Sequence, residues 1–246
     1  MFTKPKIFQP FPNLIAAEST RHGGYSQVPY TSLNLGLHSG DELETVYKNR
    51  DKFFEALTVA TENVAYSYQI HEDKILIATE AGAYEGYDAL ISNQAEVFVA
   101  VTVADCTPIL IFDAKQNAVA AIHAGWRGTV LEIVAKTISK MQATFGTNPA
   151  DCFAYIGTCI DECSFEVGEE VAQNFADVYK RFDESKNKYF VDLKKANKAQ
   201  LLACGVPENQ IEISEFSTVL QNENYFSHRK EQGKTGRMLA LIGVKK

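Results

Sequence analysis

The stretch VFVAVTVADCTPILIFDAKQNAVAAI, from Val97 to Ile122, decides the fold class. It contains three apolar runs rich in β-branched residues, Val97 to Val103, Pro108 to Phe112 and Ala118 to Ile122, and the polar turn Asp113 to Asn117 separates the last two. Continuous apolar runs of this length are typical of strands that are covered on both faces. We therefore predict three buried strands in close succession in the interior of a sheet.

The segments on either side of this stretch predict further strands and helices. The first 45 residues carry turn formers and predict loops, Ala65 to Gln69 and Ile75 to Thr79 read as strands, and Gly128 to Phe145 has the spacing of an amphipathic helix. Because strands and helices alternate only loosely, we expect a mixed sheet in an α/β (α+β) fold. Further along, the pattern predicts strands at Phe153 to Ile156, Tyr189 to Leu193, Ile211 to Ser214 and Arg237 to Val244, and helices at Glu166 to Phe182 and ending near Cys204.

Length and composition favour a single domain over residues 1–246. Of the 246 residues, 46% are hydrophobic, which is enough to bury a sizeable core, and no internal repeat or linker-like stretch interrupts the chain. No segment approaches the roughly 18 apolar residues that a membrane span needs, so we expect a cytoplasmic protein. The five cysteines are an odd number in a chain of this size, and we expect free thiols.

The charge pattern limits the classes of binding partner that we expect. The net charge is −7, and lysines and arginines are scattered without a basic run or a basic-aromatic pattern. This argues against nucleic acid or an anionic membrane as the main partner. If the substrate is an anion, specific arginines must bind it against the overall field.

Cys106 and His123 are predicted to be neighbours. Cys106 stands just before the strand that begins at Pro108, and His123 ends the next strand. Two strands joined by a short turn place their far ends side by side. His71 lies in a turn 35 residues before Cys106 and can join them only through the fold. The residues alone therefore leave two interpretations open: a joint metal site, or a buried cysteine with two unrelated histidines.

The chain resembles a known family, the YfiH-type laccase-domain proteins, once called multicopper polyphenol oxidoreductases and later described as purine nucleoside phosphorylases with adenosine deaminase activity. The resemblance runs from Thr20 to the C-terminal strand. It is carried by the ordered segments TRHGGYS (20–26), NLG (34–36), GD (40–41), NR (49–50), QIH (69–71), DALI (88–91), ADCTP (104–108), HAGWRG (123–128), FEVG (165–168) and YFSHR (225–229).

The resemblance implies a layered α/β/β/α sandwich with mixed β-sheets, in which His71, Cys106 and His123 are the zinc ligands. The chain departs from the family pattern at Glu72, Val103, Thr158 and Lys230 to Gln232. None of these departures removes a ligand, but the last weakens the assignment of an arginine site near the C-terminus.

A set of three protein ligands leaves the fourth tetrahedral position of zinc open, as in catalytic sites. Water activated there would suit attack on C6 of adenosine with loss of ammonia. Asp105, beside Cys106, would either orient a ligand imidazole or carry a proton; the alternative is a carboxylate that only stabilises its turn.

Phosphorolysis of purine nucleosides makes a different demand, because phosphate must be held while it attacks C1′ of the ribose. Guanidinium groups suit this task. The candidates for phosphate binding are Arg21 beside Gly23-Gly24, Arg127 after His123, and Arg229. The expected partners are therefore small molecules, purine nucleosides and phosphate.

Several alternatives remain open from the sequence. A multicopper oxidase would need about ten histidines, and the chain has five, so copper is conceivable only as a single His2Cys centre. A Cys-His hydrolase or amidase, acting on a cell-wall precursor peptide, would use Cys106 as nucleophile and His123 as base. A metal-dependent interaction module is a third alternative, and Cys159 with Cys163 is a weak candidate for a second metal site.

Overall fold

Two six-stranded sheets form the centre of the molecule in the computed structural model, which describes residues 1–246. The first sheet has the order β1-β2-β15-β7-β3-β5, and the second has the order β14-β10-β8-β9-β6-β4. Both sheets mix parallel and antiparallel pairs, as predicted. The strands of the first sheet are β1 (Phe2–Thr3), β2 (Leu14–Ser19), β3 (Val64–Tyr68), β5 (Gly82–Glu85), β7 (Phe98–Val103) and β15 (Met238–Val244); those of the second are β4 (Ile75–Ile77), β6 (Ala89–Ser92), β8 (Thr107–Asp113), β9 (Ala118–Ala124), β10 (Cys152–Ile156) and β14 (Ile211–Ile213).

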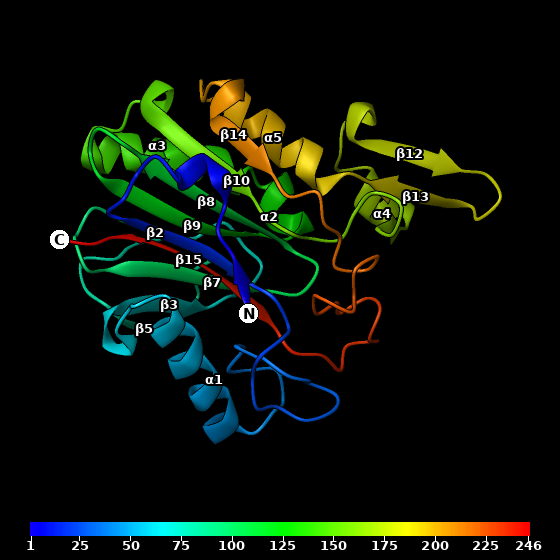
Figure 1. Cartoon of the computed structure of the whole chain (residues 1–246). Coiled ribbons are helices and arrows are strands. Elements are labelled where there is room, and N and C mark those ends of the chain that lie inside the picture. Colours follow the sequence, from blue (N-terminus) through cyan, green and yellow to red (C-terminus); the bar gives the residue numbers. More distant parts are fainter.

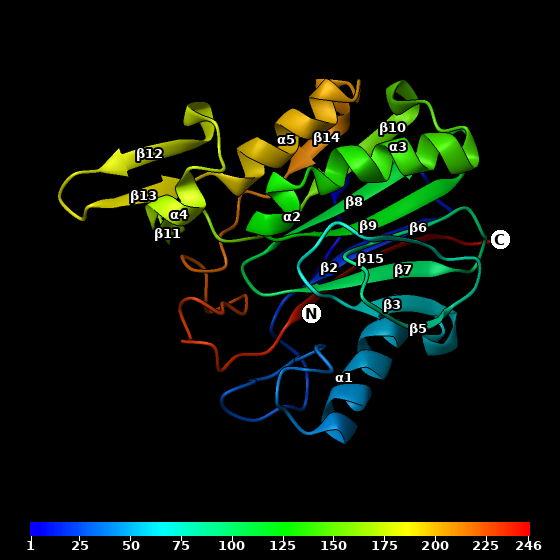
Figure 2. The same ribbon diagram turned by 180° about the vertical axis from the view of Figure 1, so that it is seen from behind.

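The sheets stack face to face, and helices cover both outer faces, as the two opposite views show (Figures 1 and 2). Helix α1 (Leu43–Ala56) packs on the first sheet, and α3 (Ile133–Phe145) and α5 (Leu193–Ala203) pack on the second. Side chains from the two inner faces, including Leu110 and Val99, form a third buried layer between the sheets. The molecule is thus the α/β/β/α sandwich that the resemblance implied. The remaining helices are α2 (Trp126–Val130), α4 (Glu169–Ala172) and the 3-10 turns Lys6–Phe8, Thr61–Asn63, Pro149–Asp151, Asp177–Tyr179 and Glu208–Gln210.

The apolar runs around Cys106 form strands as predicted, but they belong to different sheets. Strand β7 lies in the first sheet, whereas β8 and β9 lie in the second, where every residue of both is buried. The prediction that all three share one sheet was therefore wrong, because apolar runs show burial and not pairing partners. The chain crosses from the first sheet to the second between β3 and β4, between β5 and β6, and between β7 and β8.

The predicted helix from Glu166 to Phe182 does not form. Instead, this segment contains β11 (Glu166–Val167), the single turn α4 and β12 (Lys180–Asp183), and β11 and β12 pair with β13 (Lys188–Val191) in a third, small sheet. The helix-like spacing is misleading, because Phe182 is 47% exposed while Phe175 is buried. Pairing with β13 outweighs the local helical pattern, and the β12–β13 hairpin projects from the sandwich (Figure 1).

The other predicted elements agree with the structure to within a few residues, with one further exception. The helix expected from Gly128 to Phe145 is divided into α2 and α3, because Glu132 between them adopts the left-handed conformation (φ 60°). The expected loops of the first 45 residues are present around the short strand β1 and the buried strand β2. Among the helices, none combines the length and apolar character required to cross a bilayer.

Candidate metal site and cavity

The structure brings His71, Cys106 and His123 together at one end of the two sheets. One potential ligand atom from each residue lies within 4.8 Å of the others. In the β8–β9 ladder Pro108 is opposite His123, which places Cys106 beside the end of β9, as the sequence predicts. His71 follows β3 in the crossover from β3 to β4, and Cys106 follows β7 in the crossover from β7 to β8. The two crossovers therefore deliver two of the three side chains.

The thiol and the imidazole of this group polarise each other. Burial acts to raise the pKa of Cys106, but His123 and His71 outweigh it and lower that pKa to about 6. Burial acts to lower the pKa of His123, whereas the Cys106 sulfur and the Asp88 carboxylate raise it to about 9. Both shifts favour the Cys106 thiolate, which is the form that binds metals or acts as a nucleophile.

Asp88 completes this group and was not among the predicted site residues. Its side chain is fully buried, and its Oδ1 lies 2.8 Å from Nδ1 of His123. It also accepts hydrogen bonds from the backbone amides of Ile70, His71 and Glu72. Burial acts to raise the pKa of Asp88, but these hydrogen bonds hold it below its usual value. The signal available in the sequence was an acidic residue directly before the apolar strand that begins at Ala89.

Asp105, in contrast, makes no hydrogen bond to either imidazole. Its Oδ1 accepts a hydrogen bond from Thr218 Oγ1 at 2.5 Å, and its Oδ2 accepts one from the Arg229 amide at 2.6 Å. The backbone is left-handed at Asp105 (φ 81°), and its carbonyl accepts a hydrogen bond from the Ile160 amide. Asp105 thus ties two loops to the Cys106 turn, in the manner of a turn-stabilising carboxylate.

A cavity of about 510 Å³ opens at this group and has a cationic lining. Three arginines, Arg127, Arg229 and Arg237, contribute to it, together with His38 and His228, whereas Asp105 is the single acidic residue in the lining. Aromatic rings from Tyr68, Trp126 and Phe165 add apolar surface. The chain as a whole carries a net charge of −7, so this cavity is a local exception that suits an anionic group beside a planar ring.

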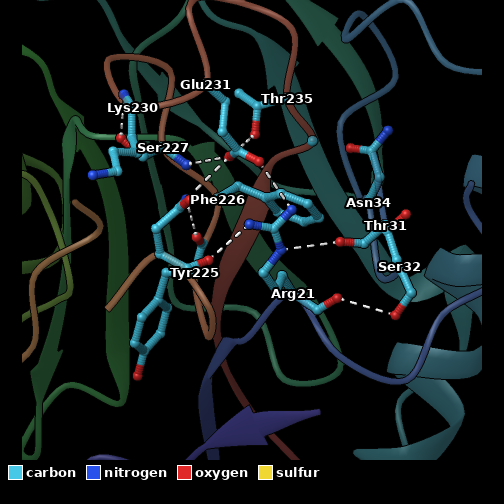
Figure 3. A network of polar contacts seen from close by, with 12 residues as sticks. Arg21, Thr31, Ser32, Asn34, Tyr225, Phe226, Ser227, Lys230, Glu231 and Thr235 are labelled. Carbon is cyan, nitrogen blue, oxygen red and sulfur yellow. Dashed lines mark hydrogen bonds and ion pairs between the residues drawn. The ribbon is translucent and has the colours of Figure 1, made fainter. Parts of the chain in front are cut away.

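Two of the three predicted arginines line the cavity. Arg127 is the second residue of α2 and stacks on Trp126, and Arg229 is held by hydrogen bonds from its Nη1 to the carbonyls of Ser164 and Glu166. Arg21 does not line the cavity. Its guanidinium pairs with Glu231 at 3.0 Å, donates to the carbonyls of Thr31 and Asn222, and stacks on Phe226. Figure 3 shows Arg21 pointing into this network, where it anchors the loop that carries Arg229.

Arg237 is the cavity arginine that was not predicted. It stands before β15, and burial lowers its pKa while the nearby Cys106 and Asp105 act in the opposite direction. Its Nη1 donates to the carbonyls of Thr235 and Gly236. An arginine keeps its charge throughout the physiological pH range. The sequence offered no local signal for Arg237, because a single arginine next to a strand is more often a surface residue.

The donor set fits a metal ion such as zinc. One sulfur and two imidazoles are a zinc-type ligand set, and no carboxylate belongs to the cluster. Gly125 leaves room beside the donors, because a Cβ at this position would lie 3.1 Å from the Cys106 sulfur and 3.4 Å from His71 Cδ2. Cys159 and Cys163 belong to no such cluster, and Cys159 is fully buried while Cys163 is exposed.

The fold and the site together define a class of proteins: two-sheet α/β/β/α sandwiches with a His-Cys-His group at the crossovers between the sheets. Within that class, the chain belongs to the family described as multi-copper polyphenol oxidoreductase laccase, whose model matches residues 15–245.

Similar proteins span almost the full length of the chain. A Bacteroides thetaiotaomicron protein named purine nucleoside phosphorylase is 37% identical and covers 96% of this chain over 93% of its own length. The Escherichia coli protein named purine nucleoside phosphorylase YfiH is 36% identical and covers 95% of each. The crystal structure of YlmD from Geobacillus stearothermophilus superposes with a TM-score of 0.92 at 35% identity, covering 97% of this chain and 94% of that one. These similarities identify the fold and the family independently of the site geometry.

Proposed function

We propose that this protein is a zinc-dependent purine nucleoside phosphorylase that also deaminates adenosine. The main support for this proposal is that one cavity is lined by both the His71-Cys106-His123 group and three arginines. The relatives' name, purine nucleoside phosphorylase, supports the same reaction class. The proposed nucleosides are adenosine, inosine, guanosine and methylthioadenosine, and the products of phosphorolysis are the free base and ribose 1-phosphate. The five free thiols fit a reducing compartment such as the cytoplasm.

The arginines account for the phosphate requirement. In phosphorolysis a phosphate oxygen forms a bond to C1′ while the C1′–N9 bond breaks and the purine leaves with the bonding electrons. Arg229 and Arg237 both lie near the Asp105-Cys106 turn, and we assign the phosphate to them, with Arg127 as the third cationic neighbour. Guanidinium groups bind phosphate through paired, charge-assisted hydrogen bonds. This assignment replaces Arg21, whose guanidinium is already committed to Glu231.

The His-Cys-His group accounts for the deamination. When bound there, zinc would supply Lewis-acid activation of water at neutral pH. His71, Cys106 and His123 would hold the ion, and Gly125 leaves space beside their ligand atoms. In the reaction, water adds to C6 of adenosine and ammonia leaves. Five histidines exclude the ligand count of a multicopper oxidase, although a single copper ion would also accept this donor set.

A second candidate function rests on a specific geometric observation. Cys106, His123 and Asp88 form a chain of nucleophile, base and orienting carboxylate, as in Cys-His hydrolases and amidases. Such an enzyme would cleave an amide, for example in a cell-wall precursor peptide, and would not need a metal. The two functions exclude each other at the sulfur, because a metal-bound thiolate does not also act as the nucleophile.

Product analysis tests the proposed function. Protein of known metal content is incubated with adenosine, inosine or methylthioadenosine, with and without phosphate, while free base and ammonia are followed separately. We expect base release only with phosphate, ammonia from adenosine without phosphate, and loss of both activities in Cys106→Ser. If metal-free protein were instead fully active, and stoichiometric alkylation of Cys106 abolished that activity, Cys106 would act as a nucleophile, as in the hydrolase.

The phosphate assignment has its own test. Arg237→Ala is expected to raise the KM for phosphate at least tenfold, while ammonia release from adenosine changes much less, because that reaction uses no phosphate. Arg181→Ala, which removes a half-exposed arginine of the β12–β13 hairpin, is the matched control and should change neither value. Equal loss of both activities in Arg237→Ala would contradict the assignment.

A further inference from the structure

The buried carboxylate of Asp88 contacts two of the three metal-binding candidates at once. It lies directly before β6, is fully buried, and accepts hydrogen bonds from three backbone amides and one imidazole. It is not itself a member of the cluster of potential ligands. A buried carboxylate with this number of donors is fixed in place, so the groups that it contacts are fixed with it.

The first effect of Asp88 is on the turn that presents His71. The amides of Ile70, His71 and Glu72 lie 3.2, 2.9 and 2.9 Å from its oxygens. His71 has a left-handed backbone (φ 62°), a conformation that is unfavourable for a residue with a Cβ. Successive amides that converge on one anion offset this cost. The carboxylate therefore stabilises the conformation that brings the His71 imidazole to Cys106.

The second effect is on the ring of His123. Its Nδ1 lies 2.8 Å from Asp88 Oδ1, and an ionised carboxylate can only accept, so Nδ1 carries the proton. This leaves Nε2 as the ring nitrogen that would bind a metal ion, with loss of any proton that it carries. The Asp88 carbonyl also accepts a hydrogen bond from the His123 amide at 2.7 Å, which locks the backbone next to the ring. The two imidazoles then lie edge to face, with their centroids 4.7 Å apart.

We infer that Asp88 is the positioning residue of the metal site: it holds the His71 turn and selects Nε2 of His123 as the ligand atom. This inference rests on the metal site of the proposed function. Asp88 contributes no ligand and does not contact the substrate. Carboxylates that orient a ligand histidine in this way typically change metal affinity by ten- to a hundredfold when they are removed.

Zinc affinity of the purified full-length protein, measured by competition with a chromophoric chelator, tests this inference. Asp88→Asn is expected to bind zinc ten- to a hundredfold more weakly, because an amide has only one acceptor oxygen. It cannot accept both from the partners of Oδ1, the His71 amide and His123 Nδ1, and from the partners of Oδ2, the Ile70 and Glu72 amides. Asp113→Asn is the matched control: Asp113 is also fully buried and also accepts from two backbone amides, but it lies at the opposite end of β8. Its affinity should stay within about threefold of wild type.

The outcomes separate this inference from the proposed function. If wild-type protein binds zinc through Cys106 and Asp88→Asn binds it equally well, the role of Asp88 is wrong while the metal site stands. If Cys106→Ser binds zinc as tightly as wild type, both are wrong.

A measurement on unmutated protein covers the case in which Asp88→Asn does not fold. The proton–nitrogen correlation spectrum of isotopically labelled histidine rings reports the tautomer of His123. We expect a slowly exchanging proton on Nδ1, and a zinc-dependent shift confined to Nε2. In the zinc-loaded protein, a proton on Nε2 with none on Nδ1, or zinc coordination through Nδ1, would overturn the inference.

Discussion

Glu18 is a carboxyl group enclosed between the two sheets. Its side chain is fully buried, and it accepts hydrogen bonds from the Tyr155 hydroxyl at 2.6 Å and the Thr158 amide at 2.9 Å. Burial raises the pKa of Glu18 to about 7, although these hydrogen bonds and the charge of Lys194 oppose the rise.

Stability should therefore depend on pH through Glu18. The pKa rises from 4.5 in the unfolded chain to about 7 in the native state, so the native state holds the proton more tightly. The stabilisation is fully present below pH 4.5 and is lost as the pH rises through 7. We expect wild type to lose roughly 3 kcal/mol more than Glu18→Gln between these limits, measured by urea unfolding at pH 4.5 and pH 8.

The control for this prediction is Glu223→Gln, since Glu223 is exposed and contacts only Asn224. Its unfolding free energy should follow the wild-type profile at each pH. Parallel profiles for wild type and Glu18→Gln would show that Glu18 is already ionised without cost in the native state.

At the scale of an element, the loop from Asn222 to Thr235 owes its shape to one carboxylate. Glu231 accepts hydrogen bonds from Arg21, Asn222, Thr235 and the amide of Ser227 (Figure 3). This loop carries His228 and Arg229 to the cavity. Glu231 therefore supplies the anion that holds this loop together.

Loss of Glu231 should release this loop. In Glu231→Ala we expect trypsin to cleave after Lys230 or Lys234 at least tenfold faster than in wild type, because the loop opens locally while the sandwich stays folded. Mass spectrometry of the fragments measures the rate. Glu223→Ala removes an acid from the same loop that makes one weak contact, and its cleavage rate should match wild type. Cleavage spread over the whole chain in Glu231→Ala would indicate global unfolding instead.

The sequence predicts elements well where burial alone determines them. The strands β7, β8 and β9 follow directly from apolar runs, whereas their division between two sheets depends on pairing with distant strands such as β15. The segment after Glu166 has helical spacing but pairs as strands, since β13 supplies backbone partners that the pattern does not show. The helix α1 was not predicted at all.

The residues of the candidate site likewise fall into those that the sequence predicts and those that it does not. The proximity of Cys106 and His123 follows from two adjacent strands, but His71 was placed with them only by the family resemblance. Asp88 and Arg237 were missed because each acts through contacts with residues that are remote in the chain. Sequence patterns report which residues are buried, and they do not report which buried charges face each other.

At the scale of the whole molecule, the candidate metal site joins the two sheets. His71 and Cys106 each lie in a segment that passes from the first sheet to the second, and His123 belongs to the second sheet. A bound ion would therefore cross-link the layers at this end, in addition to the apolar layer between them. An ion that binds the native state and not the unfolded chain stabilises the native state by mass action.

Metal removal should accordingly lower the melting temperature. With free zinc at about 100 times its dissociation constant, the stabilisation is about 2.7 kcal/mol. For a chain of this length that corresponds to a decrease of about 5 to 10 °C after chelation, measured by calorimetry. Cys106→Ser should melt at the same temperature with and without chelator. An equal decrease in both proteins would place the stabilising ion elsewhere.

The layer of side chains between the sheets has a consequence for how this family diversifies. Val99, Leu110 and Ala121 set the thickness of that layer, and none of them lines the cavity. The segments that carry His71 and Cys106 are attached to both sheets. A bulkier side chain between the sheets would therefore change their separation and shift the Cys106 sulfur relative to the two imidazoles. Substitutions between the sheets can thus change the affinity for a cation without contacting it, while every chemical group that lines the cavity stays the same.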